Sequence, residues 1–174
     1  MKSQKITISV IGGHKIDVKA VHLAHKIGRL IAKSGAVLVC GGLDGAMKAA
    51  AKGAKEAGGL TIGLLPGVHK SDANPYIDIA LPTSFGYARN AMVACCADII
   101  IALPGSHGTS SEISYGFVYN RPIIDLGNWN HEGMIKVKDS RDLEKIMRKL
   151  IKQIKNQRKI HGFPPLFIIL SKND

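Results

Sequence analysis

Residues 97–112 read ADIIIALPGSHGTSSE, and this stretch decides the fold. A β-branched apolar run at residues 99–102 is followed by a turn at Pro104 and Gly105, and then by residues that can start a helix. This order is typical of a buried parallel strand that leads through a short loop into a helix. We therefore expect an inner strand at residues 99–103 and a helix that continues through residues 113–119.

The start of this expected helix is a predicted anion-binding site. Unpaired amides of a first helical turn point outward together with the positive end of the helix dipole. Glycines let a phosphate approach the backbone closely, and a threonine adds a hydroxyl group. The predicted phosphate-binding residues of this loop are Pro104, Gly105, Ser106, His107, Gly108 and Thr109.

The same residues also fit a structural interpretation. Residues 109–112 have the spacing of a capping box, in which Thr109 accepts a hydrogen bond from the amide of Glu112 and the Glu112 carboxylate reaches back to Thr109. In the functional interpretation, the Glu112 carboxylate takes part in catalysis. The motif alone leaves both interpretations open.

Size and composition favour one domain with free thiols. A chain of 174 residues can bury a core without disulfides or metal. Its three cysteines, Cys40, Cys95 and Cys96, form no pattern typical of a zinc site, and we expect no metal. The net charge of +11 is concentrated late in the chain, because residues 136–159 hold ten Lys and Arg against three acidic residues. The excess charge therefore describes one helix surface and not the pocket.

The sequence predicts a cytoplasmic protein without a membrane partner. The first residues are polar, and the apolar run at residues 6–11 is too short for a signal peptide. No apolar stretch approaches the roughly 20 residues that span a bilayer.

Strand and helix patterns alternate along the chain. We expect strands at residues 6–11, 36–40, 60–65, 76–81, 99–103 and 122–126. We expect helices at residues 17–34, 46–57, 87–96 and from a Ser140 cap onward, the first with an N-cap at Asp17 and an inner face of Val21, Ala24, Ile27, Gly28 and Ile31. The fold class is α/β, a single-domain, doubly wound, Rossmann-like parallel sheet with helices on both faces. Residues 1–160 form this domain, and residues 161–174 form an apolar extension that could be an edge strand or a subunit contact.

Glycine-rich turns follow four of the expected strands. Because the carboxyl ends of parallel strands meet at one edge of a sheet, these turns should face one crevice rich in backbone amides. Such a crevice suits a phosphorylated small molecule. Tight packing explains the glycines of the second turn equally well. Besides the motif loop and residues 66–67, the turns contribute Gly12, Gly13, Gly41, Gly42 and Gly45.

With these residues placed, the chain resembles the Lonely Guy type phosphoribohydrolases, formerly named lysine decarboxylases, and their Rossmann-like relatives. That family carries a PGGxGTxxE motif, an Arg-Lys pair on the preceding helix and a glycine-rich turn after the second strand. The counterparts here are residues 104–112 (PGSHGTSSE), Arg89-Asn90 and residues 41–47 (GGLDGAM). The similarity covers residues 5–126, and the spacing from Arg89 to Glu112 matches without a gap.

The resemblance implies that Arg89 and Glu112 form a catalytic pair. In the family, this pair splits a nucleoside 5′-monophosphate into a free base and ribose 5-phosphate. A carboxylate can stabilise the oxocarbenium-like charge or orient water, and a guanidinium can hold the phosphate. The resemblance implies an AMP-like nucleotide as ligand, no cofactor, and a homodimer or higher homo-oligomer.

Three functional hypotheses remain. Ser106 replaces the second glycine of PGG, Asn90 replaces the lysine, and Ser111 replaces an acid that the plant enzymes carry. The chain therefore resembles more closely those relatives described only as nucleotide-binding, including molybdenum-cofactor carriers, and a non-catalytic carrier is the alternative to an enzyme. Nucleic-acid binding by residues 140–159 ranks last, because aromatic stacking residues are nearly absent there.

Overall fold

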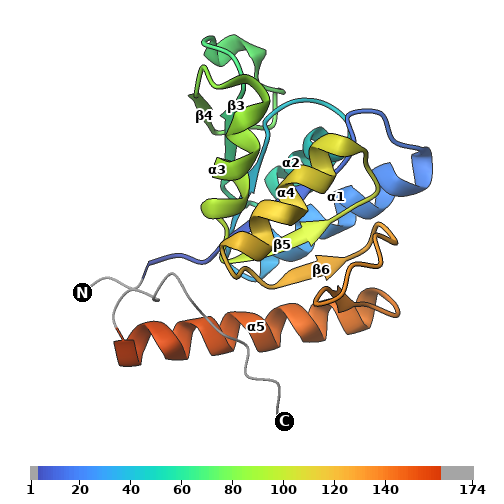
Figure 1. Cartoon of the computed structure of the whole chain (residues 1–174), viewed down its shortest axis with the longest axis vertical. Coiled ribbons are helices and arrows are strands. Elements are labelled where there is room, and N and C mark those ends of the chain that lie inside the picture. Colours follow the sequence, from blue (N-terminus) through green and yellow to red (C-terminus); the bar gives the residue numbers. More distant parts are fainter. Residues whose placement is uncertain (1–3, 162–174) are drawn as a thin grey trace.

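Parallel strands form the centre of the structure, a computed structural model that describes residues 4–161 (Figure 1). The seven strands of the sheet lie in the order β4-β3-β2-β1-β5-β6-β7, and every pairing is parallel. The expected α/β parallel sheet is therefore confirmed. The strands are β1 Thr7–Ile11, β2 Val37–Cys40, β3 Thr61–Leu65, β4 Ile79–Pro82, β5 Ile99–Ala102, β6 Ile123–Asp125 and β7 Ile135–Lys136.

The first strand of the chain lies in the middle of the sheet. Ile8 of β1 is in register with Leu38 of β2 on one side and with Ile99 of β5 on the other. The chain builds outward from β1 to β4 and then returns to place β5 beside β1. The strand order reverses between β1 and β5, which is where ligands bind in open α/β sheets.

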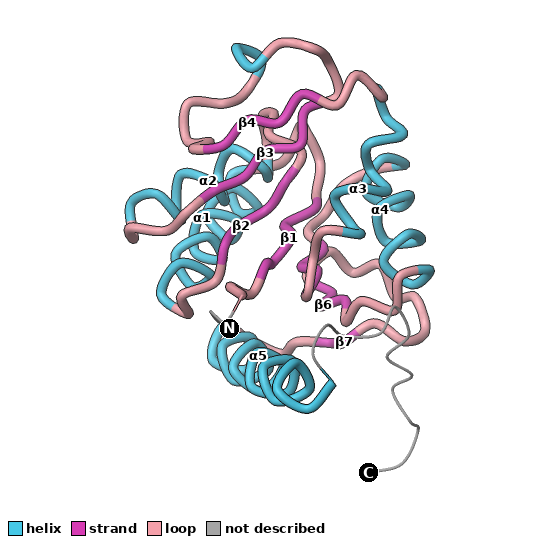
Figure 2. Tube along the Cα trace, turned by 90° about the vertical axis from the view of Figure 1, so that its left-hand side faces the viewer, coloured by secondary structure: helices cyan, strands magenta, loops and turns pink. Residues whose placement is uncertain are grey.

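Helices cover both faces of the sheet (Figure 2). They are α1 Val18–Lys33, α2 Ala46–Glu56, α3 Asn90–Cys95, α4 His107–Val118 and α5 Ser140–His161. Helices α1, α2 and α5 pack against one face, and α3 and α4 pack against the other. Short 3₁₀ turns, η1 Lys70–Asp72 and η2 Gly86–Arg89, lie in the segments around β4.

Strand β5 is apolar at every position because it supplies two cores. Ile99 and Ile101 of β5 join the core beneath α1, α2 and α5, whereas Ile100 and Ala102 join the core beneath α3 and α4. All four side chains are completely buried. Alternate residues of a strand point to opposite faces, so a strand covered on both sides reads as a continuous apolar run.

Helix α1 begins at the expected residue, but its buried face differs from the predicted one at one position. Asp17 is the N-cap, and its carboxylate accepts a hydrogen bond of 2.7 Å from the amide of Ala20. The prediction that Val21 lies inward is wrong, because Val21 is 37% exposed and Ala20 is buried in its place. The two neighbours differ by about 100° around the helix axis. Gly28 remains on the inner face, where an added Cβ would lie 1.9 Å from the carbonyl oxygen of Ala50 in α2.

Three further elements differ from the expectation. The expected helix at residues 87–96 is divided into η2 and α3. Helix α5 starts at Ser140 itself, and the Asp139 carboxylate, not Ser140, caps it by accepting hydrogen bonds from the amides of Arg141 and Asp142 at 2.8 and 2.9 Å. Aspartate is a preferred N-cap. Strand β7, with two residues, was not expected.

The apolar extension falls almost wholly at residues 162–174, which lie outside the described part of the chain. Among the helices formed by residues 4–161, none has both the length and the apolar character needed to cross a lipid bilayer.

Candidate functional site

The loops after β1 and β5 meet at the carboxyl-terminal edge of the sheet. The amide of Gly13 donates a hydrogen bond of 2.9 Å to the carbonyl of Pro104. An added Cβ on Gly105 would lie 2.2 Å from the Thr109 hydroxyl and 2.9 Å from the Gly13 nitrogen. Gly105 is therefore required by close approach of the two loops.

The amino-terminal end of α4 projects from this junction. Its hydrogen-bond ladder begins when the amide of Ser110 donates to the carbonyl of Ser106 at 3.0 Å, so the amides of residues 107–109 precede the ladder. Residues 104–107 are exposed, Gly108 is half-buried and Thr109 is buried. Most of the loop that is predicted to hold phosphate therefore lies at the surface.

The capping-box interpretation is wrong. Helix α4 begins at His107 with Ser106 as its N-cap, so Thr109 and Glu112 both lie inside the helix. Glu112 is more than one turn beyond the helix start and cannot reach back to cap it. Its carboxyl group is free to turn toward α3.

The turn after β2 packs closely against Arg89 and against the loop after β1. An added Cβ on Gly41 would lie 2.4 to 2.7 Å from the guanidinium atoms of Arg89. Gly45 has a φ of +66°, and an added Cβ would lie 2.3 Å from the carbonyl oxygens of Gly13 and His14. Gly41 and Gly42 are buried, and Gly12 is half-buried against Ala46. These glycines bring the β1 loop, the β2 loop and Arg89 into contact.

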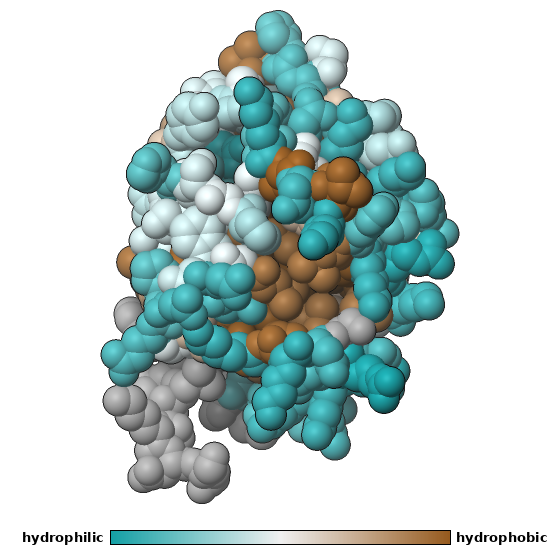
Figure 3. Space-filling view, turned by 90° about the vertical axis from the view of Figure 1, so that its right-hand side faces the viewer, coloured by the Kyte–Doolittle hydropathy of each residue, from teal (hydrophilic) through white to brown (hydrophobic). Residues whose placement is uncertain are grey.

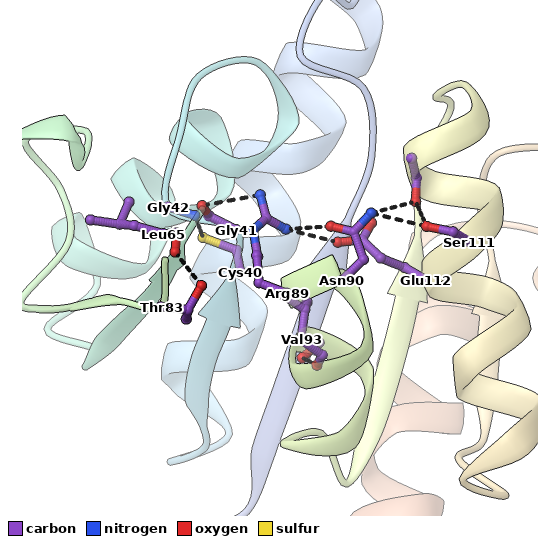
Figure 4. Close-up of polar contacts among 12 residues, drawn as sticks. Cys40, Gly41, Gly42, Leu65, Thr83, Arg89, Asn90, Val93, Ser111 and Glu112 are labelled. Carbon is purple, nitrogen blue, oxygen red and sulfur yellow. Dashed lines mark hydrogen bonds and ion pairs between the residues drawn. The ribbon is translucent and has the colours of Figure 1, made fainter. Parts of the chain in front are cut away.

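Arg89 and Glu112 lie side by side although 23 residues separate them (Figure 4). The Nη1 atom of Arg89 is 3.3 Å from Oε1 of Glu112, and both residues are only 6% exposed. Nη2 of Arg89 donates to the carbonyl of Gly41 at 3.4 Å. Nε of Arg89 is buried and has no hydrogen-bond partner. The guanidinium thus has donor capacity to spare.

Burial dominates the electrostatics of this pair. It raises the pKa of Glu112 from 4.5 to about 8, although the charge of Arg89 acts in the opposite direction. Burial likewise raises the pKa of the neighbouring Cys40 thiol to about 11, and Cys40 accepts a hydrogen bond of 3.4 Å from the amide of Gly42. Burial therefore favours the protonated form of the Glu112 carboxyl well above its ordinary range of pH. In that form Glu112 does not neutralise the permanent charge of Arg89.

The face toward which β5 and β6 point in Figure 1 combines polar and apolar surface (Figure 3). Apolar side chains gather near its centre, and hydrophilic side chains border them.

The model of the SLOG cluster4 family matches residues 5–157. The chain belongs to this family. The match spans most of the chain, including every strand and helix that contributes to the site. It confirms the resemblance carried by the motif at residues 104–112.

Two relatives of this SLOG cluster4 chain are informative. An uncharacterised protein from Archaeoglobus fulgidus is 40% identical over 120 residues, which are 68% of this chain and 78% of that protein. The cytokinin riboside 5′-monophosphate phosphoribohydrolase of Mycobacterium tuberculosis is 32% identical over 120 residues, 64% of each protein. This chain therefore matches less than two thirds of the length of the mycobacterial enzyme.

Two solved structures resemble the SLOG cluster4 chain over most of its length. The molybdenum cofactor binding protein of Rippkaea orientalis has a TM-score of 0.78 and 31% identity, and the match covers 85% of this chain and 98% of that one. The molybdenum cofactor carrier protein of Chlamydomonas reinhardtii has the same TM-score and 28% identity, with 86% and 99% covered.

Sequence reasoning missed a polar group beside the catalytic candidates. Asn90 and Ser111 were noted only as departures from the family motif, yet their side chains are hydrogen-bonded to each other. Asn90 is 4% exposed and also touches Arg89. No spacing or composition signal predicts this contact, because it depends on how α3 and α4 pack.

Proposed function

We propose that the protein binds a nucleoside 5′-monophosphate at the junction of the β1 and β5 loops and hydrolyses its N-glycosidic bond. The observation that carries this proposal is the contact of Arg89 with Glu112, at 3.3 Å, beside the amino-terminal end of α4. A buried guanidinium, a carboxyl group and an exposed helix start lie together where the strand order reverses.

The phosphate belongs at the start of α4. The amides of residues 107–109 precede the hydrogen-bond ladder, and the helix dipole places partial positive charge there. Arg89 adds a full positive charge that a protonated Glu112 does not neutralise. These features favour a ligand with at least one negative charge.

The raised pKa of Glu112 suits proton donation. A protonated carboxyl can donate to the nitrogen of the leaving base while water attacks C1′ of the ribose. The base leaves with the proton of Glu112, and the water oxygen becomes the hydroxyl on C1′ of ribose 5-phosphate. The proton that the water loses returns to the Glu112 carboxylate and restores its starting state. This is the reaction named for the mycobacterial relative, which shares 32% identity with this chain.

The test is hydrolysis of AMP by the purified protein. We expect release of ribose 5-phosphate, and we expect Glu112→Gln to stop it while the variant stays folded. Glu132→Gln, which changes an exposed glutamate in the β6–β7 loop, is the matched control. Failure of the wild-type protein to hydrolyse any nucleoside 5′-monophosphate at high enzyme concentration would exclude the enzymatic proposal.

A second candidate function is the carriage of a phosphorylated ligand without chemistry. It is favoured by the two molybdenum-cofactor proteins, which this chain matches over 98% and 99% of their length. A ligand that binds only the native state raises its stability. The carrier function predicts a higher melting temperature with molybdopterin or a nucleotide, and no product. Stabilisation accompanied by consumption of the ligand would instead favour the enzyme.

A further inference from the structure

Asn90 connects Arg89 to the first turns of α4 (Figure 4). Its Oδ1 accepts a hydrogen bond of 2.8 Å from Nη1 of Arg89. Its Nδ2 donates to Oγ of Ser111 at 2.9 Å and to the carbonyl of Gly108 at 3.3 Å. Ser111 in turn donates to the same carbonyl at 2.7 Å. One buried amide thus bridges the guanidinium and the helix whose start is the proposed phosphate site.

The bond to Asn90 is the shortest hydrogen bond that Arg89 makes in the described chain. The bonds from Arg89 to Glu112 and to the Gly41 carbonyl are 3.3 and 3.4 Å, near the outer limit of hydrogen-bond distances. Nε of Arg89 has no partner. Asn90, more than Glu112, therefore decides where the guanidinium lies.

The chemistry of the amide explains why one residue can make this bridge. An asparagine side chain carries an acceptor and two donors, so it can face a guanidinium and a carbonyl at once. A lysine would offer no acceptor to Arg89 and would place a second cation beside it. An aspartate at this position would have no donor, so neither the Gly108 carbonyl nor the Ser111 hydroxyl oxygen could accept a hydrogen bond from it.

We infer that Asn90 is a positioning residue, anchored through Ser111, that fixes the Arg89 guanidinium relative to α4 and holds it back from full pairing with Glu112. The inference that Asn90 positions Arg89 is argued from the contacts described above. The inference that this position matters for ligand binding rests on the proposed function, because it assumes that Arg89 contacts the ligand.

The first arm of the test needs no ligand. In Asn90→Ala, Nη1 of Arg89 keeps only the Glu112 carboxylate as a side-chain acceptor, so the pair tightens and the pKa of Glu112 falls. Arg89 and Cys40 are the charged and titratable groups that face Glu112 in the described structure. We expect the decline in wild-type stability between about pH 5 and about pH 8 to flatten by at least about half in the variant.

Serine variants of α4 supply the milder test and its control. Ser111→Ala removes the anchor but leaves the Asn90 acceptor, so we expect a partial flattening and no further change when it is combined with Asn90→Ala. Ser114→Ala removes an exposed hydroxyl that donates to Ser110 in the same helix, and it should keep the wild-type profile. A wild-type pH profile in both Asn90→Ala and Ser111→Ala would overturn the inference, and Ser111→Ala decides it if Asn90→Ala does not fold.

The second arm measures AMP and ribose 5-phosphate binding by calorimetry at a fixed pH. We expect Asn90→Ala to weaken both by at least about tenfold, as when a charged hydrogen-bonded contact is misplaced, and Ser114→Ala to leave both unchanged. Unchanged affinity in Asn90→Ala would overturn the inference about ligand binding. Failure of the wild-type protein to bind either compound would overturn the proposed function, while the pH arm still decides the position of Arg89.

Discussion

Replacing Glu112 with glutamine removes a buried carboxyl group whose pKa burial raises from 4.5 to about 8. Between these two pH values, the folded protein keeps a proton that the unfolded chain has already lost. Because the unfolded state then binds fewer protons, wild-type stability falls as the pH rises through this range. The stability contributed by the protonated group is present below about pH 4.5 and lost above about pH 8.

The size of the effect follows from the shift in pKa. One pKa unit corresponds to about 1.4 kcal/mol, so the shift of Glu112 from 4.5 to about 8 sets an upper limit of about 5 kcal/mol. Proteins relax around buried charges and behave as though their dielectric constant were near 20, which reduces the cost. We therefore expect wild-type stability to fall by roughly 2 to 5 kcal/mol between about pH 5 and about pH 9.

Urea denaturation at closely spaced pH values measures this loss, with fluorescence of the single tryptophan as the probe. Glu112→Gln should remove most of the decrease in the free energy of unfolding with pH. The stability of the variant relative to the wild type should therefore increase as the pH rises. The exposed Glu132→Gln variant should follow the wild type. Parallel profiles for the wild type and Glu112→Gln would refute the reasoning, because they would mean that Glu112 does not titrate between the two pH values.

Three further substitutions test the surroundings of the site and the frame that holds it. Gly41→Ala places a Cβ 2.4 Å from Nη2 of Arg89, so the guanidinium must move, and AMP hydrolysis should fall about a hundredfold while the circular dichroism spectrum is unchanged. Ile101→Ala removes a completely buried side chain from the larger core and should lower the free energy of unfolding by about 4 kcal/mol, measured by urea denaturation; a loss below about 1 kcal/mol would contradict its packing. Asp17→Ala removes the cap of α1 and should cost about 1 kcal/mol in the same assay, with Asp44→Ala as an exposed control.

The architecture follows closely from local patterns. The run at residues 99–102 is apolar throughout because both of its faces are covered, and that property is visible in the sequence. The cap at Asp17 is equally local, since an aspartate ahead of an amphipathic run is a common helix start. Strand β7 escaped prediction because two residues carry no periodicity.

The site could be predicted only in part. The resemblance to the Lonely Guy family implied that Arg89 and Glu112 form a pair, whereas the motif at residues 109–112 gave Glu112 two competing roles. Choosing between them required the exact first residue of α4, and helix ends are set by backbone geometry that a sequence shows poorly. The contact between Asn90 and Ser111 depends on the packing of two helices whose sequences carry no mark of each other.

The central place of β1 has a consequence for synthesis. β1 is synthesised before the other strands of this sheet, but its second neighbour, β5, is made some 90 residues later, as the register of Ile8 with Ile99 shows. Until then the nascent sheet exposes an unpaired apolar edge, a known hazard for aggregation. Binding of chaperones to the nascent chain should therefore be greatest while residues 40–100 are being translated. It should decrease once β5 pairs with the free edge of β1.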